Sequence, residues 1–287
     1  GEDMFTSFIR KFNPKIKSTF ISDKHHLTHT SCAFYNSGFK EAIGIVIDGC
    51  GSRVSFSDLK IEGDEAESTF LCSYKEIKKI HGVYKNALGP NIENQKYQLQ
   101  NTVNIAHVYE AITSYLGFSP IEGGKTMGLS SYGKENKKIP NFLINQKFNK
   151  NIFSFNSYIP DFQHPTLDFS LLEEFSNKDL AWKVQYDTQL LVKEYIKKAI
   201  DKVQLKNVVC SGGYFLNCVA NYYLIKEFPD INFYFEPISH DGGISLGAAL
   251  YRWYELNPNS KSYKQKSLYY GPQYSKEQLL EGIKKYV

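Results

Sequence analysis

The 287-residue sequence lacks the patterns that would place it in a membrane or a disulfide-rich class. No apolar run reaches the roughly 18 residues that a membrane-spanning helix needs. The five cysteines are odd in number, scattered along the chain, and include no CxxC pair. We therefore expect a reduced, soluble, cytoplasmic protein without a membrane partner.

Blocks of like charge are also missing, and the formal net charge is only +4. Such a modest charge allows an anionic small ligand but does not favour a nucleic-acid partner, which usually needs a concentrated basic face. The hydrophobic content of 42% and the charged content of 22% are typical of a globular chain and not of a disordered one. The length allows one large domain or two small ones.

Neither the P-loop spacing nor a full GxGxxG motif occurs. Three other glycine-rich turns follow strand-like runs, at Asp48-Gly49-Cys50-Gly51, Ser211-Gly212-Gly213 and Asp241-Gly242-Gly243. Backbone N–H groups in such a turn, at the start of a helix, suit a phosphate. A single turn of this kind usually has only a structural role and binds no ligand. Three in one chain, two of them with an aspartate, favour a nucleotide held between turns.

The zinc-protease motif HExxH is absent, yet the segment SDKHHLTHTSCAFYNSG (22–38) holds three of the seven histidines. His25 and His29 are four residues apart and fall on one face of a predicted helix. This spacing can place two imidazoles on one metal, with carboxylates completing a shell that Fe(II) or Zn accepts. The alternative is a helix whose histidines cap or hydrogen-bond locally. His26 could contact phosphate, support the metal ligands from behind, or be structural.

The hydrophobic pattern predicts an α/β chain. A buried strand is expected over 41–49, and further strand candidates at 54–63 and 68–77 suggest an antiparallel meander. A helix is predicted over 102–116, where Gly117 can adopt the left-handed conformation that ends a helix.

The second half of the sequence predicts a helix over about 180–203, preceded by SNKD, which fits a capping box. Two strand–glycine–helix units follow, the second with its strand at 231–235 and its helix ending near Leu256. Residues 121–133 are predicted to be a Gly/Ser-rich loop. Residues 134–170 are expected to be an irregular insertion, and residues 18–23 a short strand.

Four ordered segments of the sequence together resemble a known family. They are HHLTHTSCAFYNSGFKEAIGIVIDGCGS, GGKTMGLSSYG, CSGGYFLNCVAN and HDGGISLGAALY. They look like those of the O-carbamoyltransferases of the nodulation and antibiotic-tailoring type, and the resemblance spans roughly residues 18–275. That family is similar in its first domain to the universal tRNA threonylcarbamoyl-transfer proteins. The resemblance implies an actin-like ATPase (ribonuclease H-like) α/β fold.

The resemblance also implies a set of site residues. A mononuclear metal, Fe(II) by analogy, would be bound by His25, His29, Asp48 and Asp241, with His26 behind them. The candidate nucleotide- or phosphate-binding residues are Gly49, Gly51, Lys125, Gly212, Gly213, Asn217 and Gly242. Asn217 follows the Gly212-Gly213 turn closely enough to face the ligand, whereas Asn221 is expected to have a packing or capping role. Lys125 could reach a phosphate or be an exposed lysine.

The implied reaction is an ATP-dependent O-carbamoyl transfer. In the family, ATP with Mg²⁺ and carbamoyl phosphate give a carbamoyl-adenylate in a C-terminal domain. The carbamoyl group then passes to a hydroxyl of a small-molecule or nucleoside acceptor in the actin-like domain, where the metal could act as a Lewis acid. Family members open with a Gly-rich turn that contains a His base. No such segment precedes residue 22 here, so the catalytic base is unassigned.

We therefore expect two actin-like subdomains, the first of them incomplete. Residues 1–40 would be a partial first subdomain with the HxxxH helix, and residues 41–263 the second subdomain with the turns. Residues 264–287 would begin a C-terminal adenylating-type domain that is mostly absent, so the chain is interpreted as truncated at both ends.

Other functions stay open. A tRNA threonylcarbamoyl-transfer protein would need a serine-glycine-glycine turn where DGCGS stands. A non-catalytic actin-like module would bind nucleotide and metal for assembly. A sugar-kinase relative shares the implied fold but would not explain His25 and His29. A homodimer is also left open.

Overall fold

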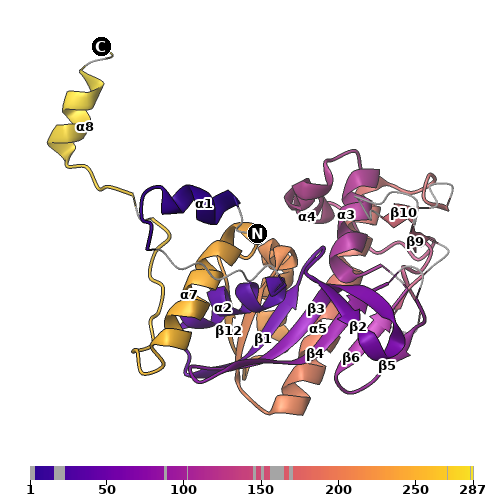
Figure 1. Cartoon of the computed structure of the whole chain (residues 1–287). Coiled ribbons are helices and arrows are strands. Elements are labelled where there is room, and N and C mark those ends of the chain that lie inside the picture. Colours follow the sequence, from indigo (N-terminus) through magenta and orange to yellow (C-terminus); the bar gives the residue numbers. More distant parts are fainter. Residues whose placement is uncertain are drawn as a thin grey trace.

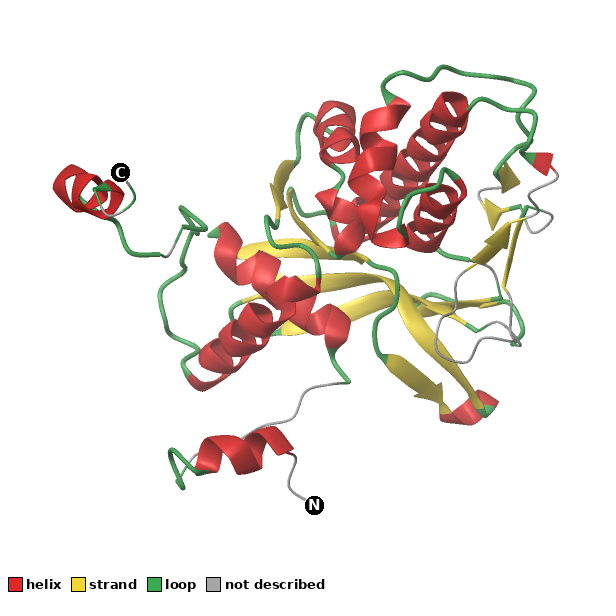
Figure 2. Cartoon of the chain, turned by 90° about the horizontal axis from the view of Figure 1, so that it is seen from above, coloured by secondary structure: helices red, strands yellow, loops and turns green. Residues whose placement is uncertain are grey.

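A mixed β-sheet with helices on both faces forms the centre of the computed structural model (Figures 1 and 2). The structure describes residues 4–15, 23–86, 89–101, 103–144, 147–149, 152–155, 165–167, 171–269, 271–284 and 286. Along the sheet the strands are β12 (Asn232–Phe235), β11 (Asn207–Ser211), β1 (Glu41–Ile47), β3 (Ile61–Ser73), β4 (Ile77–Lys85), β6 (Tyr97–Gln100) and β5 (Ile92–Glu93). A further strand, β2 (Arg53–Phe56), pairs with β3.

Strand directions change across the sheet. β1 is parallel to β11, and β11 is parallel to β12. On its other side β1 is antiparallel to β3, and β3 is antiparallel to β4, which confirms the predicted meander. The expected strand over 54–63 is wrong in detail, because the chain turns inside it. Lys60 has a left-handed φ of 52°, so this segment forms the β2–β3 hairpin.

Strand β1 is buried on both faces, which explains its nearly continuous apolar sequence. Ile43, Ile45 and Ile47 point to the side covered by α3 (Ile105–Tyr115), α5 (Asn177–Val203) and α6 (Cys218–Glu227). Ala42 and Val46 point to the other side, where α2 (His25–Ser37) and α7 (Ile244–Leu256) lie. The two cores are therefore separated by the sheet (Figure 2).

Small residues bring α2 close to its neighbours. A Cβ on Gly247 of α7 would lie 1.9 Å from the carbonyl oxygen of Thr28. A Cβ on Gly44 of β1 would lie 2.6 Å from the Thr30 side chain. Almost the whole of α2 is consequently buried, and its histidines are held at a fixed depth above the sheet.

The predicted helices are present, with one difference at a cap. Helix α3 begins at Ile105 and is followed by Gly117, whose φ of 85° confirms the left-handed end. Helix α5 begins at Asn177, and the Ser176 side chain makes no capping bond, so the capping box is wrong. The Asp179 carboxylate accepts instead from the Lys134 N–H at 3.1 Å.

Both strand–glycine–helix units are confirmed. After β11 the chain forms the 3-10 turn Gly213–Leu216 and then α6. After β12 it reaches the turn Asp241–Gly243 and then α7. Since β1, β11 and β12 are parallel, their carboxyl ends meet at one edge of the sheet. All three predicted turns therefore lie at that edge.

The expected loop over 121–133 is a helix. Pro120–Glu122 forms a 3-10 turn and Gly123–Ser130 forms α4. Ser119 and Glu122 make a reciprocal capping box, which outweighs the low helix propensity of the glycines.

Within 134–170, the described residues form two small sheets. These pair β7 (Leu143–Ile144) with β8 (Lys147–Phe148), and β9 (Phe153–Phe155) with β10 (Pro165–Leu167). The strand predicted over 18–23 falls almost wholly outside the described residues.

Two helices lie at the ends of the chain. They are α1 (Met4–Arg10) and α8 (Lys276–Ile283), and α8 extends away from the sheet (Figure 1). Among the described residues, no helix combines the length and apolarity needed to span a bilayer. Helix α2 packs on the same sheet as the later elements, and the domain boundaries at residues 40 and 263 stay predictions.

The close approach of α7 to α2 can be tested by adding one methyl group. We expect Gly247→Ala to lower the free energy of unfolding by about 3 kcal/mol, because the new Cβ meets backbone that cannot move independently. Gly128→Ala on α4 is the matched control, since a Cβ there meets nothing within 4 Å. That change should raise stability by up to about 1 kcal/mol. Equal urea midpoints for the two variants would contradict the packing described.

Candidate metal and nucleotide site

Four side chains converge at the edge of the sheet where the three turns meet. His25, His29, Asp48 and Asp241 each place one possible ligand atom within 4.8 Å of the others. The Nε2 atoms of His25 and His29 are 3.1 Å apart. Nε2 of His25 lies 3.2 Å from Oδ2 of Asp48 and 3.3 Å from Oδ1 of Asp241. All four predicted metal ligands are thus brought together.

Hydrogen bonds fix the orientation of these groups. His29 is fully buried, and its Nδ1 bonds to the Ser211 hydroxyl at 3.2 Å, which directs Nε2 toward the cluster. Asp48 directly follows β1 and accepts the Gly213 N–H on Oδ1 at 2.9 Å, so Oδ2 faces His25. The last residue of β11 therefore orients the imidazole, and the turn that follows orients the carboxylate.

The cluster strongly shifts the pKa values of its members. Burial lowers the pKa of His25, but hydrogen bonds to Asp241 and Asp48 outweigh it and raise the pKa to about 10. Burial opposes ionisation of Asp48, yet the hydrogen bond from His25 and the neighbouring histidine charges lower its pKa to about 2. Hydrogen bonds from His25 and His29 hold the pKa of Asp241 far below its usual range. These shifts favour ionised carboxylates with a cationic group between them.

This donor set fits a single divalent metal ion. It offers two imidazole nitrogens and two carboxylate oxygens, a combination that Fe(II), Zn and Mn accept. Ser211 and Gly213 supply the outer hydrogen bonds that usually orient metal ligands. The Nε2 atoms of the two histidines face each other at 3.1 Å, and a shared cation would satisfy both lone pairs. The metal itself stays a prediction.

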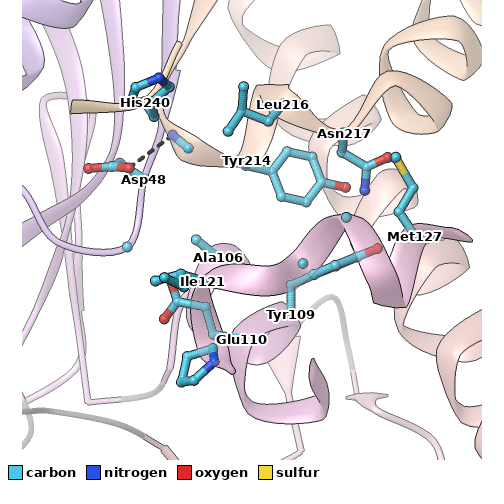
Figure 3. A pocket seen from close by; sticks show the side chains of 15 residues that line it. Asp48, Ala106, Tyr109, Glu110, Ile121, Met127, Tyr214, Leu216, Asn217 and His240 are labelled. Atoms are coloured by element: carbon cyan, nitrogen blue, oxygen red, sulfur yellow. Dashed lines mark hydrogen bonds between the residues drawn. The ribbon is translucent and has the colours of Figure 1, made fainter. Parts of the chain in front are cut away.

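A cavity of about 370 Å³ opens beside Asp48 (Figure 3). It lies between α3, α4 and the turn after β11. Asp48 and His240 lie at one end, and Tyr109, Met127 and Asn217 at the other. The residues lining it are Asp48, Gly49, Ala106, Tyr109, Glu110, Pro120, Ile121, Gly123, Gly124, Met127, Gly213, Tyr214, Leu216, Asn217 and His240. A phosphate at the Asp48 end would leave the mostly apolar remainder for a base or an acyl group.

Three of the predicted nucleotide-binding residues line this cavity, namely Gly49, Gly213 and Asn217. The Gly49 carbonyl accepts from the buried Lys85 ammonium at 2.7 Å, which pulls this turn toward the interior. Asn217 exchanges hydrogen bonds with Gln185 and caps α6 by accepting from the Ala220 N–H. Its side chain therefore already makes hydrogen bonds that stabilise the fold.

The other predicted glycines have local structural roles. Gly212 has a φ of 96°, and a Cβ there would lie 2.3 Å from the Ile47 carbonyl oxygen. The N–H of Gly242 donates to Nδ1 of His240 at 2.9 Å. A Cβ on Gly51 would meet the His26 ring at 2.6 Å. None of the three lines the cavity, and their contact with a nucleotide stays a prediction.

Lys125 and His26 lie apart from the cavity lining. Lys125 is exposed on α4 and forms an ion pair with Glu122 at 2.5 Å. Its neighbours Gly123 and Gly124 line the cavity, whereas Lys125 does not. His26 is fully buried, and its Nδ1 bonds to the Ser68 hydroxyl at 2.7 Å, so it lies behind the cluster. Asn221 donates to the Phe215 carbonyl and has the structural role expected of it.

The sequence did not reveal several lining residues. Tyr109 and Glu110 lie on α3, whose apolar periodicity identified only the face toward the core. Burial, helped by the Asp48 charge, raises the pKa of Glu110 to about 7. His240 directly precedes Asp241, and this position next to a predicted ligand was a signal that it lies at the site. No sequence pattern marks Met127 and Leu216 as lining residues, and only the tertiary structure places them at the cavity.

Comparison with known proteins identifies relatives. The profile of the family described as Carbamoyltransferase N-terminus matches residues 5–250. The uncharacterized protein MJ1058 of Methanocaldococcus jannaschii is 26% identical, over 94% of this chain and 44% of its own length. The nodulation protein NolNO of Sinorhizobium fredii is 25% identical, over 92% of this chain and 35% of its own. The chain spans less than half the length of these relatives.

Solved structures show the same fold at low identity. Full-length HypF, in its phosphate- and nucleotide-bound form, matches with a TM-score of 0.52 and 15% identity, over 88% of this chain and 46% of HypF. HypF of T. kodakarensis matches with a TM-score of 0.52 and 14% identity, over 88% of this chain and 39% of its own. The resemblance to carbamoyltransferases drawn from the four segments is confirmed, and the mixed α/β architecture agrees with it.

The charge balance of the cluster predicts an unusual titration of His25. In protein freed of metal by a chelator, its imidazole should stay protonated well above pH 6.5 and titrate near pH 10. Because the folded-state pKa is raised, the stability from this interaction is complete below about pH 6.5 and is lost as the pH rises through about 10.

NMR of the histidine rings measures this titration directly. In Asp241→Asn the pKa of His25 should fall toward its ordinary value, because one raising partner has lost its charge. Asp230→Asn, on another exposed turn, should leave it unchanged. A wild-type His25 that titrates near pH 6.5 would show that the carboxylates do not act on it.

Proposed function

The chain belongs to the carbamoyltransferase N-terminal family, and we propose that it forms the transfer half of an ATP-dependent O-carbamoyltransferase. The reaction would move a carbamoyl group from a carbamoyl-adenylate, made from carbamoyl phosphate and ATP, to a hydroxyl of a small-molecule or nucleoside acceptor. The observation that supports this most is the convergence of His25, His29, Asp48 and Asp241 beside the 370 Å³ cavity.

We propose one mononuclear metal, Fe(II) by preference, held by these four side chains. When bound, it would supply Lewis acidity toward a phosphoryl or carbonyl oxygen. Asp48 and Asp241 would neutralise part of its charge, and Ser211 would hold the His29 ring in place. Binding would require His25 to lose its proton, because its Nε2 faces the site.

The cavity supports a nucleotide or adenylate as the donor. Its Asp48 end adjoins the proposed metal, where a phosphate would be attracted, and its other end offers Tyr109, Met127 and Asn217. Full-length HypF, which shares the fold, has been solved with phosphate and nucleotide bound. Positioning an acceptor hydroxyl against the carbamoyl carbon would then supply much of the rate.

The strand pattern supports the finer fold assignment. Three antiparallel strands, β1, β3 and β4, followed on the other side of β1 by parallel β11 and β12, give the arrangement expected of an actin-like, ribonuclease H-like subdomain. Formation of the adenylate and the general base for the acceptor would come from parts of a longer protein, as the greater length of the relatives suggests.

Metal content tests the proposal. Anaerobically purified chain should hold about one iron-like metal per chain, as measured by elemental analysis. His29→Ala should lose it, because the buried Nε2 has no substitute, whereas His81→Ala, on β4 away from the cluster, should retain it. Asp241→Ala should weaken metal affinity at least tenfold without disturbing the core, since this side chain is 69% exposed. Equal metal content in wild type and both site variants would refute the assignment.

Nucleotide binding tests the cavity separately. Gly124 lines it, and a Cβ there would meet nothing within 4 Å, so we expect Gly124→Phe to project a ring at the cavity without straining α4. We expect a tenfold or greater loss of ATP affinity by calorimetry, which is about 1.4 kcal/mol.

Gly128→Phe is the matched control, since Gly128 lies one turn further along α4 in equally open surroundings and does not line the cavity. It should bind ATP as the wild type does. ATP affinity that is unchanged in Gly124→Phe would place the nucleotide elsewhere.

A further inference from the structure

A second cavity, of about 250 Å³, lies between the sheet and helices α3 and α5. It is formed by β3, β4 and β6 on one side, by the first turn of α3, by the middle of α5 and by β8. The lining residues are Glu67, Val83, Glu93, Gln98, Gln100, Val103, Asn104, Ile105, Lys147, Phe148, Leu191, Glu194, Tyr195 and Lys198. Nine of these fourteen residues, Tyr195 included, are polar or charged, unlike the lining of the first cavity.

Glu67 is a buried carboxylate in the lining of this cavity. The residue is 3% exposed, and its Oε1 accepts from the Ile105 N–H at 3.3 Å. Its Oε2 has no hydrogen-bond partner among the described residues. An unpaired buried carboxylate oxygen is destabilising, so a native fold normally supplies a donor for it. A donor inside the cavity that Glu67 lines would pair with this oxygen.

The charges around the cavity indicate what kind of donor fits. Glu67, Glu93 and Glu194 provide three carboxylates, and Lys147 and Lys198 provide two ammonium groups. With Glu67 ionised, the lining holds one more carboxylate than ammonium groups, and the buried Lys85 ammonium acts on Glu67 from outside the lining. Burial raises the pKa of Glu67 to about 7, although the Ile105 N–H and the Lys85 ammonium lower it, and a cationic donor at Oε2 would further favour the ionised form.

We propose that this cavity binds a small organic amine, whose ammonium group donates to Oε2 of Glu67. The volume is below the usual range of roughly 300–1,000 Å³ for drug-sized ligands, so the amine must be small. The apolar atoms of Val83, Val103 and Leu191 would contact its carbon chain. The amides of Gln98 and Gln100 offer further hydrogen bonds to a polar substituent.

The proposed amine site lies directly behind the metal-binding turn. Asn104 lines the second cavity, and its side-chain N–H donates to the carbonyl oxygen of Asp48 at 2.8 Å. Ile47, the residue before Asp48, is the cross-strand partner of Glu67. The two cavities share no lining residue, so the amine site is separate from the proposed nucleotide site.

Calorimetry of the 287-residue chain with n-butylamine at pH 8 tests the proposal, with 1-butanol as the neutral probe of matching shape. The amine should bind, and the alcohol should bind at least tenfold more weakly. Glu67→Gln keeps the shape of the side chain but removes its charge, and should weaken amine binding tenfold or more. Glu62→Gln, on the exposed part of the same strand, is the control and should bind like the wild type.

Leu191→Trp provides a second variant, because it fills the cavity from a partly buried position and leaves Glu67 intact. It should abolish amine binding while metal content stays that of the wild type. The proposal is overturned if the amine does not bind, if alcohol and amine bind equally, or if Glu67→Gln leaves the affinity unchanged. A crystal structure with amine present and only water at Glu67 would overturn it as well.

Discussion

Two ionised carboxylates and two imidazoles lie within 4.8 Å of one another at the edge of the sheet, and this concentration of charge requires a cation. In metal-free protein a proton on His25 meets that requirement, as its raised pKa indicates. A divalent ion would meet it better, because it contacts all four ligand atoms at once. Much of the surrounding structure holds Asp48 and His29 in this cluster.

The fold satisfies this constraint with ordinary secondary structure. Parallel strands bring their following turns to one edge, which places Asp48, Ser211 and Asp241 together. Helix α2 must then approach the sheet closely enough for its histidines to reach them. Gly44 and Gly247 permit that approach, since any side chain at either position would strike α2.

The metal ligands could be predicted from sequence because their signal is local. HxxxH defines a helix face, and an aspartate after a buried strand lies at a known end of the sheet. The segment that carries Lys125 was expected to be a loop because a run of glycine and serine suggests one, whereas the capping box at Ser119 starts a helix there. The capping box predicted at Ser176 failed because Asp179 binds the Lys134 N–H, a contact from a distant segment.

Other features depend on tertiary packing and leave no pattern in the sequence. Glu67 occurs in a strand whose neighbours are mostly polar, so nothing local marks it as buried. Its burial follows from helices α3 and α5, which cover that part of the sheet. The same holds for Tyr109 and Glu110, which face the first cavity only once α4 is placed opposite α3.

X-ray absorption spectroscopy at the iron edge, on anaerobic protein loaded with one equivalent of Fe(II), tests the central claim most directly. The account predicts a shell of nitrogen and oxygen atoms only, with outer-shell scattering from two imidazole rings. Sulfur scatterers, or a shell without imidazole, would contradict it, because the metal would then be bound away from His25 and His29.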